Sequence, residues 1–177
     1  MKKILIALIC LVFIKAGLNA QATFDTCQYA NRFNGEWMYA NGNDTIRVFL
    51  RAQRNYYTEF KTVQDMILGW HEYKQGNTII ESTYPNRFMT IYNVDTLTYN
   101  SVSIGLKSLG AHCNSGIMTA SGTITDYLQD KQGKIVTVTL NAAGNVITWK
   151  QWHKANNGMF GRPSGMTLPS EFILLKQ

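Results

Sequence analysis

The chain has 177 residues, of which 45% are hydrophobic and 16% are charged. This length suits one domain, and the hydrophobic share is too high for a disordered chain. The formal net charge of +6 is partly carried by the N-terminus: without Lys2, Lys3 and Lys15, the 17 basic side chains become 14 against 11 acidic ones, a net charge of +3. So small an excess does not indicate nucleic acid or an anionic membrane as a partner.

The first 20 residues have the organisation of a secretory signal peptide. Two lysines follow Met1, an apolar run of 11 residues occupies positions 4–14, and a short segment ends at Ala20. As a helix this run would cover about 16 Å, roughly half of the hydrocarbon thickness of a bilayer, so it is too short for a membrane anchor. We therefore predict a signal peptide over residues 1–20 and an exported domain, periplasmic or extracellular, over residues 21–177. No later segment has the 18 apolar residues of a transmembrane helix.

The rest of the sequence predicts one short helix followed by strands. Residues 25–33 favour the helix, with Asp25 or Thr26 as its cap. After Phe33 the hydrophobic period becomes two, which is typical of strands. The predicted strands cover residues 36–41, 45–51, 56–63, 66–74, 78–82, 88–94, 98–104, 116–127, 135–140, 146–153 and 171–176.

This series of strands indicates the fold class. About ten strands in an unbroken series, with almost no helix, favour an antiparallel meander. A meander leaves two open edges, and closing the sheet into an up-and-down barrel removes both of them. We therefore predict an all-β fold, an antiparallel up-and-down β-barrel with a short N-terminal helix. A β-sandwich is the alternative.

Two motifs resemble the lipocalin family. The segment FNGEW at residues 33–37 is similar to the F-x-G-x-W signature that opens the lipocalin barrel, and TDY at residues 125–127 is similar to a short motif between two late strands of that family. The resemblance implies a lipocalin-like barrel whose base is closed by Trp37. It also implies a basic side chain packed across this indole, for which Lys176 and Lys150 are the candidates.

A second resemblance covers most of the mature chain. The segment LGWHEY at residues 68–73 and the C-terminal segment from Leu168 resemble an uncharacterised family of exported lipocalin-like proteins of Bacteroidota. No activity is implied by this resemblance.

Two cysteines remain after the predicted signal peptide, which contains Cys10, has been removed. Cys27 and Cys113 are separated by a loop of about 87 residues, and in an oxidising compartment they allow one disulfide. The alternative is two buried thiols. Spacing alone does not decide between them, because a disulfide needs the two Cα atoms within about 6 Å.

The sequence contains no recognisable catalytic or metal-binding motif. His71, His112 and His153 are the three histidines, and they do not have the paired spacing of a zinc site. A metal site shared by all three across the barrel is a hypothesis, but histidines in strands more commonly belong to the wall. Cys113 follows His112 directly, a geometry that seldom places the imidazole on the sulfur. We predict no enzyme, no catalytic residues, no metal and no cofactor.

The aromatic residues indicate a function more directly. A barrel of about eight to ten strands either fills its interior with side chains or holds one small apolar ligand. We predict an exported, non-enzymatic binding protein for a small hydrophobic molecule, with Trp37, Tyr39, Trp70 and Tyr73 around it. The alternative is a filled barrel that binds an envelope or extracellular protein through its loops, in particular residues 155–169.

Overall fold

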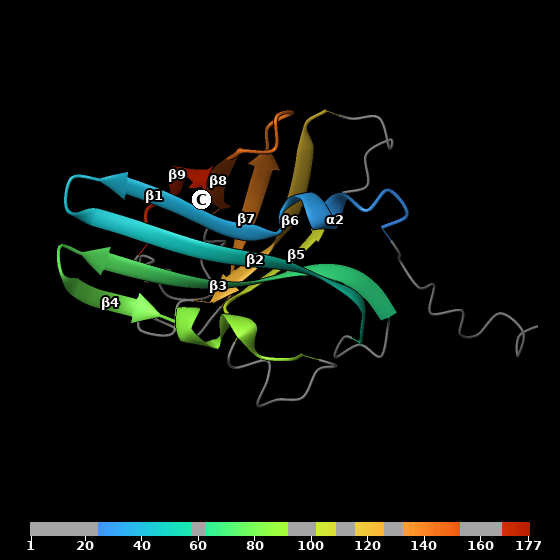
Figure 1. Cartoon of the computed structure of the whole chain (residues 1–177), viewed down its shortest axis with the longest axis horizontal. Coiled ribbons are helices and arrows are strands. Elements are labelled where there is room, and N and C mark those ends of the chain that lie inside the picture. Colours follow the sequence, from blue (N-terminus) through green and yellow to red (C-terminus); the bar gives the residue numbers. More distant parts are fainter. Residues whose placement is uncertain (1–24, 58–62, 92–101, 109–115, 126–132, 153–167) are drawn as a thin grey trace, which may run out of the picture.

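The structure is a computed structural model, and it describes residues 25–57, 63–91, 102–108, 116–125, 133–152 and 168–177 (Figure 1). Within these ranges the chain forms nine strands, the short helix α2 (Tyr29–Arg32) and the 3-10 helix η1 (Tyr84–Phe88). Neither of these two helices is long and apolar enough to cross a membrane. The strands are β1 (Gly35–Asn41), β2 (Asp44–Tyr57), β3 (Val63–Gln75), β4 (Thr78–Ser82), β5 (Ile104–Ser108), β6 (Met118–Thr125), β7 (Gly133–Leu140), β8 (Val146–Trp152) and β9 (Glu171–Lys176).

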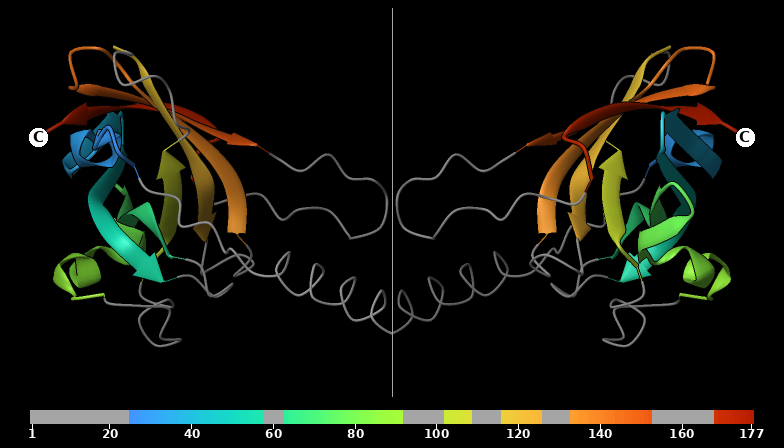
Figure 2. Two further views of the ribbon diagram at one scale, coloured as in Figure 1. Left: turned by 90° about the vertical axis from the view of Figure 1, so that its right-hand side faces the viewer. Right: turned by 90° about the vertical axis from the view of Figure 1, so that its left-hand side faces the viewer.

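Eight of these strands close into an antiparallel barrel. Each strand pairs with its neighbour in the order β1-β2-β3-β5-β6-β7-β8-β9, and β9 pairs again with β1. β4 lies outside this ring, as an additional strand on the edge of β3. In Figure 2, β1 and β2 stand on one side of the barrel, and β6 and β7 stand on the other. The predicted all-β barrel is therefore confirmed, and the β-sandwich alternative is wrong.

The two ends of the barrel differ in what covers them. At one end the β1–β2 and β3–β4 turns are joined, because the Gly76 amide donates to the Asn43 carbonyl oxygen at 2.7 Å. We call this the turn end, defined by residues 41–44 and 75–78. At the other end α2 contacts the β7–β8 turn, where Arg32 Nη2 donates to the Ala142 carbonyl oxygen at 2.9 Å. We call this the plug end, defined by α2 and residues 141–145; Figure 1 shows the turn end on the left and α2 on the right.

Alternation along the strands builds the core inside the barrel. In β2, Ile46, Val48 and Leu50 are buried in the interior, whereas Arg47 and Phe49 belong to the outer face. This is the period-two pattern of a strand with one buried face. Side chains that are fully buried in the same interior cluster come from all around the ring: Phe33, Trp37, Ile67, Ile104, Leu106, Ile124, Val136, Val138, Leu140, Ile147, Trp149 and Leu174.

The helix is shorter than the predicted span 25–33. It begins at Tyr29, because Gln28 has a left-handed conformation with φ 55° and interrupts the helical path before it. Asp25 still contributes to the helix start, since its Oδ2 accepts a hydrogen bond from the Ala30 amide at 2.6 Å. Asp25 was expected as a cap, and it acts from outside the helix, as an acceptor for a first-turn amide that has no partner in the helix.

The predicted strand over residues 56–63 is wrong. β2 continues through a β-bulge between Gln53 and Tyr56, where Asn55 has φ 52°. Tyr56 and Tyr57 are therefore the last two residues of β2, whereas Val63 begins β3. A bulge adds one residue to one strand without ending the pairing, so the hydrophobic alternation breaks while the strand continues.

Two weaker strand predictions also fail in the described part of the chain. Residues 88–91 are not a strand, because Phe88 is the last residue of η1, which has Pro85 near its start. Proline fixes φ and lacks the amide proton that a strand ladder needs. The predicted strand over 98–104 contributes only its last residue, since β5 begins at Ile104.

The predicted strand over 45–51 begins one residue after β2 does and ends six residues before it. The remaining predicted strands lie within three residues of observed ones at their described ends, and 78–82 and 171–176 match β4 and β9. The predicted signal peptide, residues 1–20, lies outside the described residues and stays a prediction.

Candidate functional site

Trp37 is buried inside the plug end of the barrel. It lies on the inner face of β1 and is fully buried, and its Nε1 donates to the Phe33 carbonyl oxygen at 2.8 Å. The ammonium of Lys176, the last residue of β9, lies 5.1 Å from the centre of the indole ring. This is the distance of a cation–π contact. Of the two predicted basic partners, Lys176 makes the contact, whereas Lys150 pairs with Glu171 at 2.9 Å on the surface.

Tyr39 and Tyr73 also face the interior, closer to the turn end. Tyr39 packs against the interior cluster, with its ring centre 5.5 Å from that of Phe172. The hydroxyl of Tyr73 donates to Asp44 Oδ1 at 3.0 Å. Burial is the main cause that raises the pKa of Tyr73, and the hydrogen bond to Asp44 raises it further. The phenol is therefore a protonated donor at neutral pH. Three of the four predicted ligand-binding residues therefore share the inside of the barrel, and ligand binding by them stays a prediction.

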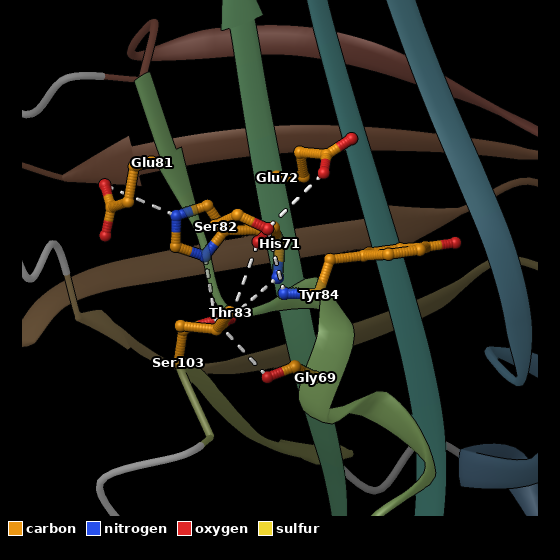
Figure 3. Close-up of polar contacts among 8 residues, drawn as sticks. All are labelled: Gly69, His71, Glu72, Glu81, Ser82, Thr83, Tyr84 and Ser103. Atoms are coloured by element: carbon orange, nitrogen blue, oxygen red, sulfur yellow. Dashed lines mark hydrogen bonds and ion pairs between the residues drawn. The ribbon is translucent and has the colours of Figure 1, made fainter. Parts of the chain in front are cut away.

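A buried polar network lies in the same interior (Figure 3). His71 Nδ1 is 2.7 Å from Ser103 Oγ, and His71 Nε2 is 3.5 Å from Glu81 Oε2. Ser103 Oγ also lies 2.9 Å from Thr83 Oγ1 and 3.4 Å from the Gly69 carbonyl oxygen. We call His71, Glu81, Thr83 and Ser103 the His71 network; all four residues are buried.

The His71 network forms where β3 changes its neighbour. β5 pairs with β3 at residues 67–69, and β4 pairs with it from Glu72 onward, so His71 lies in the gap between the two ladders. The Thr83 amide donates to the His71 carbonyl oxygen at 2.8 Å, and the His71 amide donates to Thr83 Oγ1 at 3.1 Å. Side chains thus satisfy polar groups that a regular ladder leaves open at such a junction.

The order of groups in this network is that of a hydrolase triad: hydroxyl, imidazole, carboxylate. A nucleophile needs access to a substrate, and the Ser103 residue is only 2% exposed. Its hydroxyl is also surrounded by Thr83 and the Gly69 carbonyl oxygen. The geometry supports a structural role for the His71 network, in which buried polar contacts link β3, β4 and the start of β5.

The family of the chain follows from comparison with known proteins. The model of a family of unknown function, DUF6705, matches residues 1–177. The chain belongs to this family. No curated protein and no solved structure matches the chain.

Trp70 does not join the other predicted site residues in this DUF6705 protein. It is fully buried, but in a second cluster with Tyr56, Leu68 and Ile91, apart from the interior cluster that contains Tyr73. The predicted position of Trp70 inside the barrel is therefore corrected. The physical reason is parity: residues three apart in one strand lie on opposite faces. The same parity separates His71 from Glu72, as the sequence predicts.

We call the second cluster, which contains Trp70, the outer cluster. The helix η1 covers it, and arginine side chains hold η1 in place. Arg51 Nη2 donates to the Met89 carbonyl oxygen at 2.8 Å, and its guanidinium lies 5.0 Å from the centre of the Trp70 ring. Tyr84, the first residue of η1, lies between the guanidinium groups of Arg47 at 4.6 Å and Arg87 at 4.3 Å. Burial, together with the nearby carboxyl group of Glu36, raises the pKa of Tyr84 to about 12, so this ring stays neutral beside its two cations. Cation–π contacts of this kind attach η1 to the barrel.

Several predicted residues fall outside the described part of the chain. Cys27 is half-buried and packs against the interior cluster, but its predicted partner Cys113 is not among the described residues. His112 and His153 also lie outside them, so the three-histidine metal site is untested. The same holds for residues 155–167 of the predicted interaction loop and for the last two residues of the TDY motif.

Ser103, Thr83 and Glu81 belong to no sequence motif that marks them as members of a site. The available signal was the parity of β3, which places His71 on the same face as Ile67 and so inside the barrel. A buried histidine needs polar partners, but the sequence does not say which distant residues supply them.

Proposed function

We propose that this protein is an exported, non-enzymatic binding protein with lipocalin-like architecture, and that it holds a small hydrophobic molecule in the half of its barrel nearer the turn end. The lipocalin-like assignment is supported by the FNGEW segment, by the short helix before β1, and by the contact of Lys176 with Trp37. The resemblance to exported Bacteroidota proteins is part of the same proposal.

The gradient of burial along the inner face of β1 carries this proposal. Trp37 is fully buried and sealed by Phe33 and Lys176, whereas Tyr39, two residues nearer the turn end, remains partly exposed. Ile80 of β4, which packs against the same cluster, is also partly exposed. This difference supports a barrel that is closed at the plug end and entered from the turn end, the arrangement in which small barrels hold ligands.

The first prediction concerns a retained ligand. Native mass spectrometry of the protein purified from the envelope of its own cells should show the polypeptide with one additional small-molecule mass. Tyr39→Ala should lower the occupied fraction severalfold, because it removes an aromatic ring from the interior. Met38→Ala is the matched control, since the adjacent residue of a strand lies on the opposite face. Only the bare polypeptide mass, or equal losses in the two variants, would contradict the proposal.

The second candidate function is protein binding, and one observation favours it. Phe88 and Met89 at the end of η1 are 69% and 40% exposed, although they are large and apolar. Exposed apolar side chains beside arginines are typical of protein contact sites. The same native spectrum separates the two functions, because a protein partner adds a mass of thousands of daltons rather than hundreds.

Export also implies an oxidising compartment, so we propose a disulfide between Cys27 and Cys113. The chain between β5 and β6 contains Cys113, and its described flanks, Ser108 and Gly116, lie at the plug end, where Cys27 precedes α2. The intact mass of the exported protein should rise by two hydrogen atoms on reduction, and unfolding of the reduced form should be about 2–4 kcal/mol easier. An unchanged mass would show two free thiols.

A further inference from the structure

The inner wall formed by β8, β9 and β1 carries three aromatic rings in contact. Trp149 stacks on Phe172 with ring centres 5.5 Å apart and an interplanar angle of 18°. Tyr39 contacts the other side chain of this pair, Phe172, also at 5.5 Å. Gln151 follows on the same face of β8, because it pairs with Val136, a fully buried residue of the interior cluster. An apolar wall therefore ends in a buried amide.

Two polar atoms on this wall have no hydrogen-bond partner within the described structure. They are Nε1 of Trp149, which can only donate, and Oε1 of Gln151, which can only accept. Trp149 is fully buried and Gln151 is 8% exposed. Buried polar atoms are nearly always paired, and leaving one unpaired is costly. The buried indole at the plug end is paired in the usual way, since Nε1 of Trp37 donates to the Phe33 carbonyl oxygen.

The orientation of the Gln151 amide is fixed by its other contacts. Gln151 Nε2 donates to the Pro169 carbonyl oxygen at 3.0 Å, and the Gln151 backbone amide donates to the Ser170 carbonyl oxygen at 2.7 Å. Since a carbonyl oxygen can only accept, the nitrogen of the side-chain amide must be the atom that faces Pro169. The oxygen is therefore the free atom, and it cannot turn to Pro169 without losing a bond.

From these observations we propose that the ligand of the barrel is a flat, mainly apolar molecule that carries a carboxamide-like group, an acceptor beside a donor. The acceptor of the ligand accepts a hydrogen bond from Trp149 Nε1, and its donor donates one to Gln151 Oε1. The apolar body of the ligand lies along the wall of Phe172 and Tyr39. This inference rests on the proposed function and adds the polar chemistry of the ligand to it. A purely hydrocarbon ligand would leave both buried atoms unpaired.

Two probes of similar shape test this inference on the full chain, expressed with its own N-terminal segment for export. Benzamide carries the carbonyl and the amino group, whereas isopropylbenzene has neither. In a nitrogen–proton NMR spectrum, benzamide should move the indole N–H signal of Trp149 downfield, and isopropylbenzene should not. The signal of Trp149 is identified by its absence in Trp149→Phe. This comparison on the unchanged chain does not depend on any variant.

The affinities measured by calorimetry supply the second readout. Trp149→Phe keeps a ring in the stack and removes only the donor, so benzamide should bind about tenfold more weakly, as expected for one hydrogen bond to a buried group. Trp70→Phe is the matched control: its Nε1 is equally buried and also unpaired among the described residues, but it belongs to the outer cluster. That variant should leave benzamide binding unchanged.

The outcomes separate the inference from the function beneath it. If both probes bind equally well and Trp149→Phe changes neither affinity, the barrel binds apolar molecules and the carboxamide inference is wrong. If benzamide binds but Trp70→Phe weakens it as much as Trp149→Phe does, the inference is also wrong. If neither probe binds, the proposed function and the inference fail together.

Discussion

Replacing Trp37 by alanine should lower the free energy of unfolding by about 3–5 kcal/mol, the cost of removing a large buried aromatic side chain from a packed core. Trp37 is fully buried, and its Nε1 holds the Phe33 carbonyl oxygen just after α2. The substitution therefore opens a cavity and also leaves that carbonyl unpaired. Because α2 and β9 both meet at this indole, the substitution should weaken the pairing of β9 with β1, which closes the barrel, as well as the local packing.

Denaturant unfolding of three variants measures how this effect divides. Trp37→Phe retains part of the volume but loses the hydrogen bond to Phe33, so it should fall between the wild type and Trp37→Ala. Lys176→Met retains the aliphatic stem over the ring and removes only the charge, so it should cost no more than about 1 kcal/mol. A loss below about 1 kcal/mol for Trp37→Ala would show that Trp37 does not close the barrel.

Local pattern was sufficient to predict the parts of the fold in which chain neighbours determine the structure. The strand at 171–176 has clear alternation and is present as predicted. The role of Trp37 at one end of the barrel is implied by the resemblance of the segment FNGEW to the lipocalin signature. These features are local, so the sequence contains them directly.

The failures have long-range or backbone causes. The bulge before Tyr56 keeps β2 paired where the alternation breaks, and a left-handed Asn55 has no unique sequence signature. Trp70 and Tyr73 are both aromatic, but parity along the unbroken β3 places them in different clusters. Aromatic character indicates burial, whereas the face is set by strand register.

The His71 network could not be predicted for a related reason. Its side chains come from β3, from β4, from the residue between β4 and η1, and from the residue before β5. They meet only because β3 exchanges one neighbour for another. The position of such a junction depends on which strands pair, a property of the whole sheet. The sequence does not predict that Trp149 Nε1 and Gln151 Oε1 lack hydrogen-bond partners either, since an unpaired group is recognised only when all its neighbours are known.

The His71 network should make the second large contribution to stability. His71→Leu keeps a similar volume but removes the imidazole that faces both Ser103 Oγ and the carboxylate of Glu81. The substitution removes the imidazole contact from the buried Ser103 hydroxyl and from the Glu81 side chain, and each such lost contact costs about 1–3 kcal/mol. Chemical denaturation at neutral pH measures the difference. Ser103→Ala, which removes only a hydroxyl, should cost about 1–3 kcal/mol.

A double-mutant cycle distinguishes a coupled network from independent contacts. Glu81→Gln replaces the carboxyl group by an amide of similar size that can still form hydrogen bonds, so it should cost less stability in the His71→Leu background than in the wild type. The coupling energy between positions 71 and 81 should then exceed about 0.5 kcal/mol, as found for residues in one network. Additive losses would show that His71 and Glu81 act separately. A coupled result would show that His71 and Glu81 stabilise the junction of β3 and β4 as one unit.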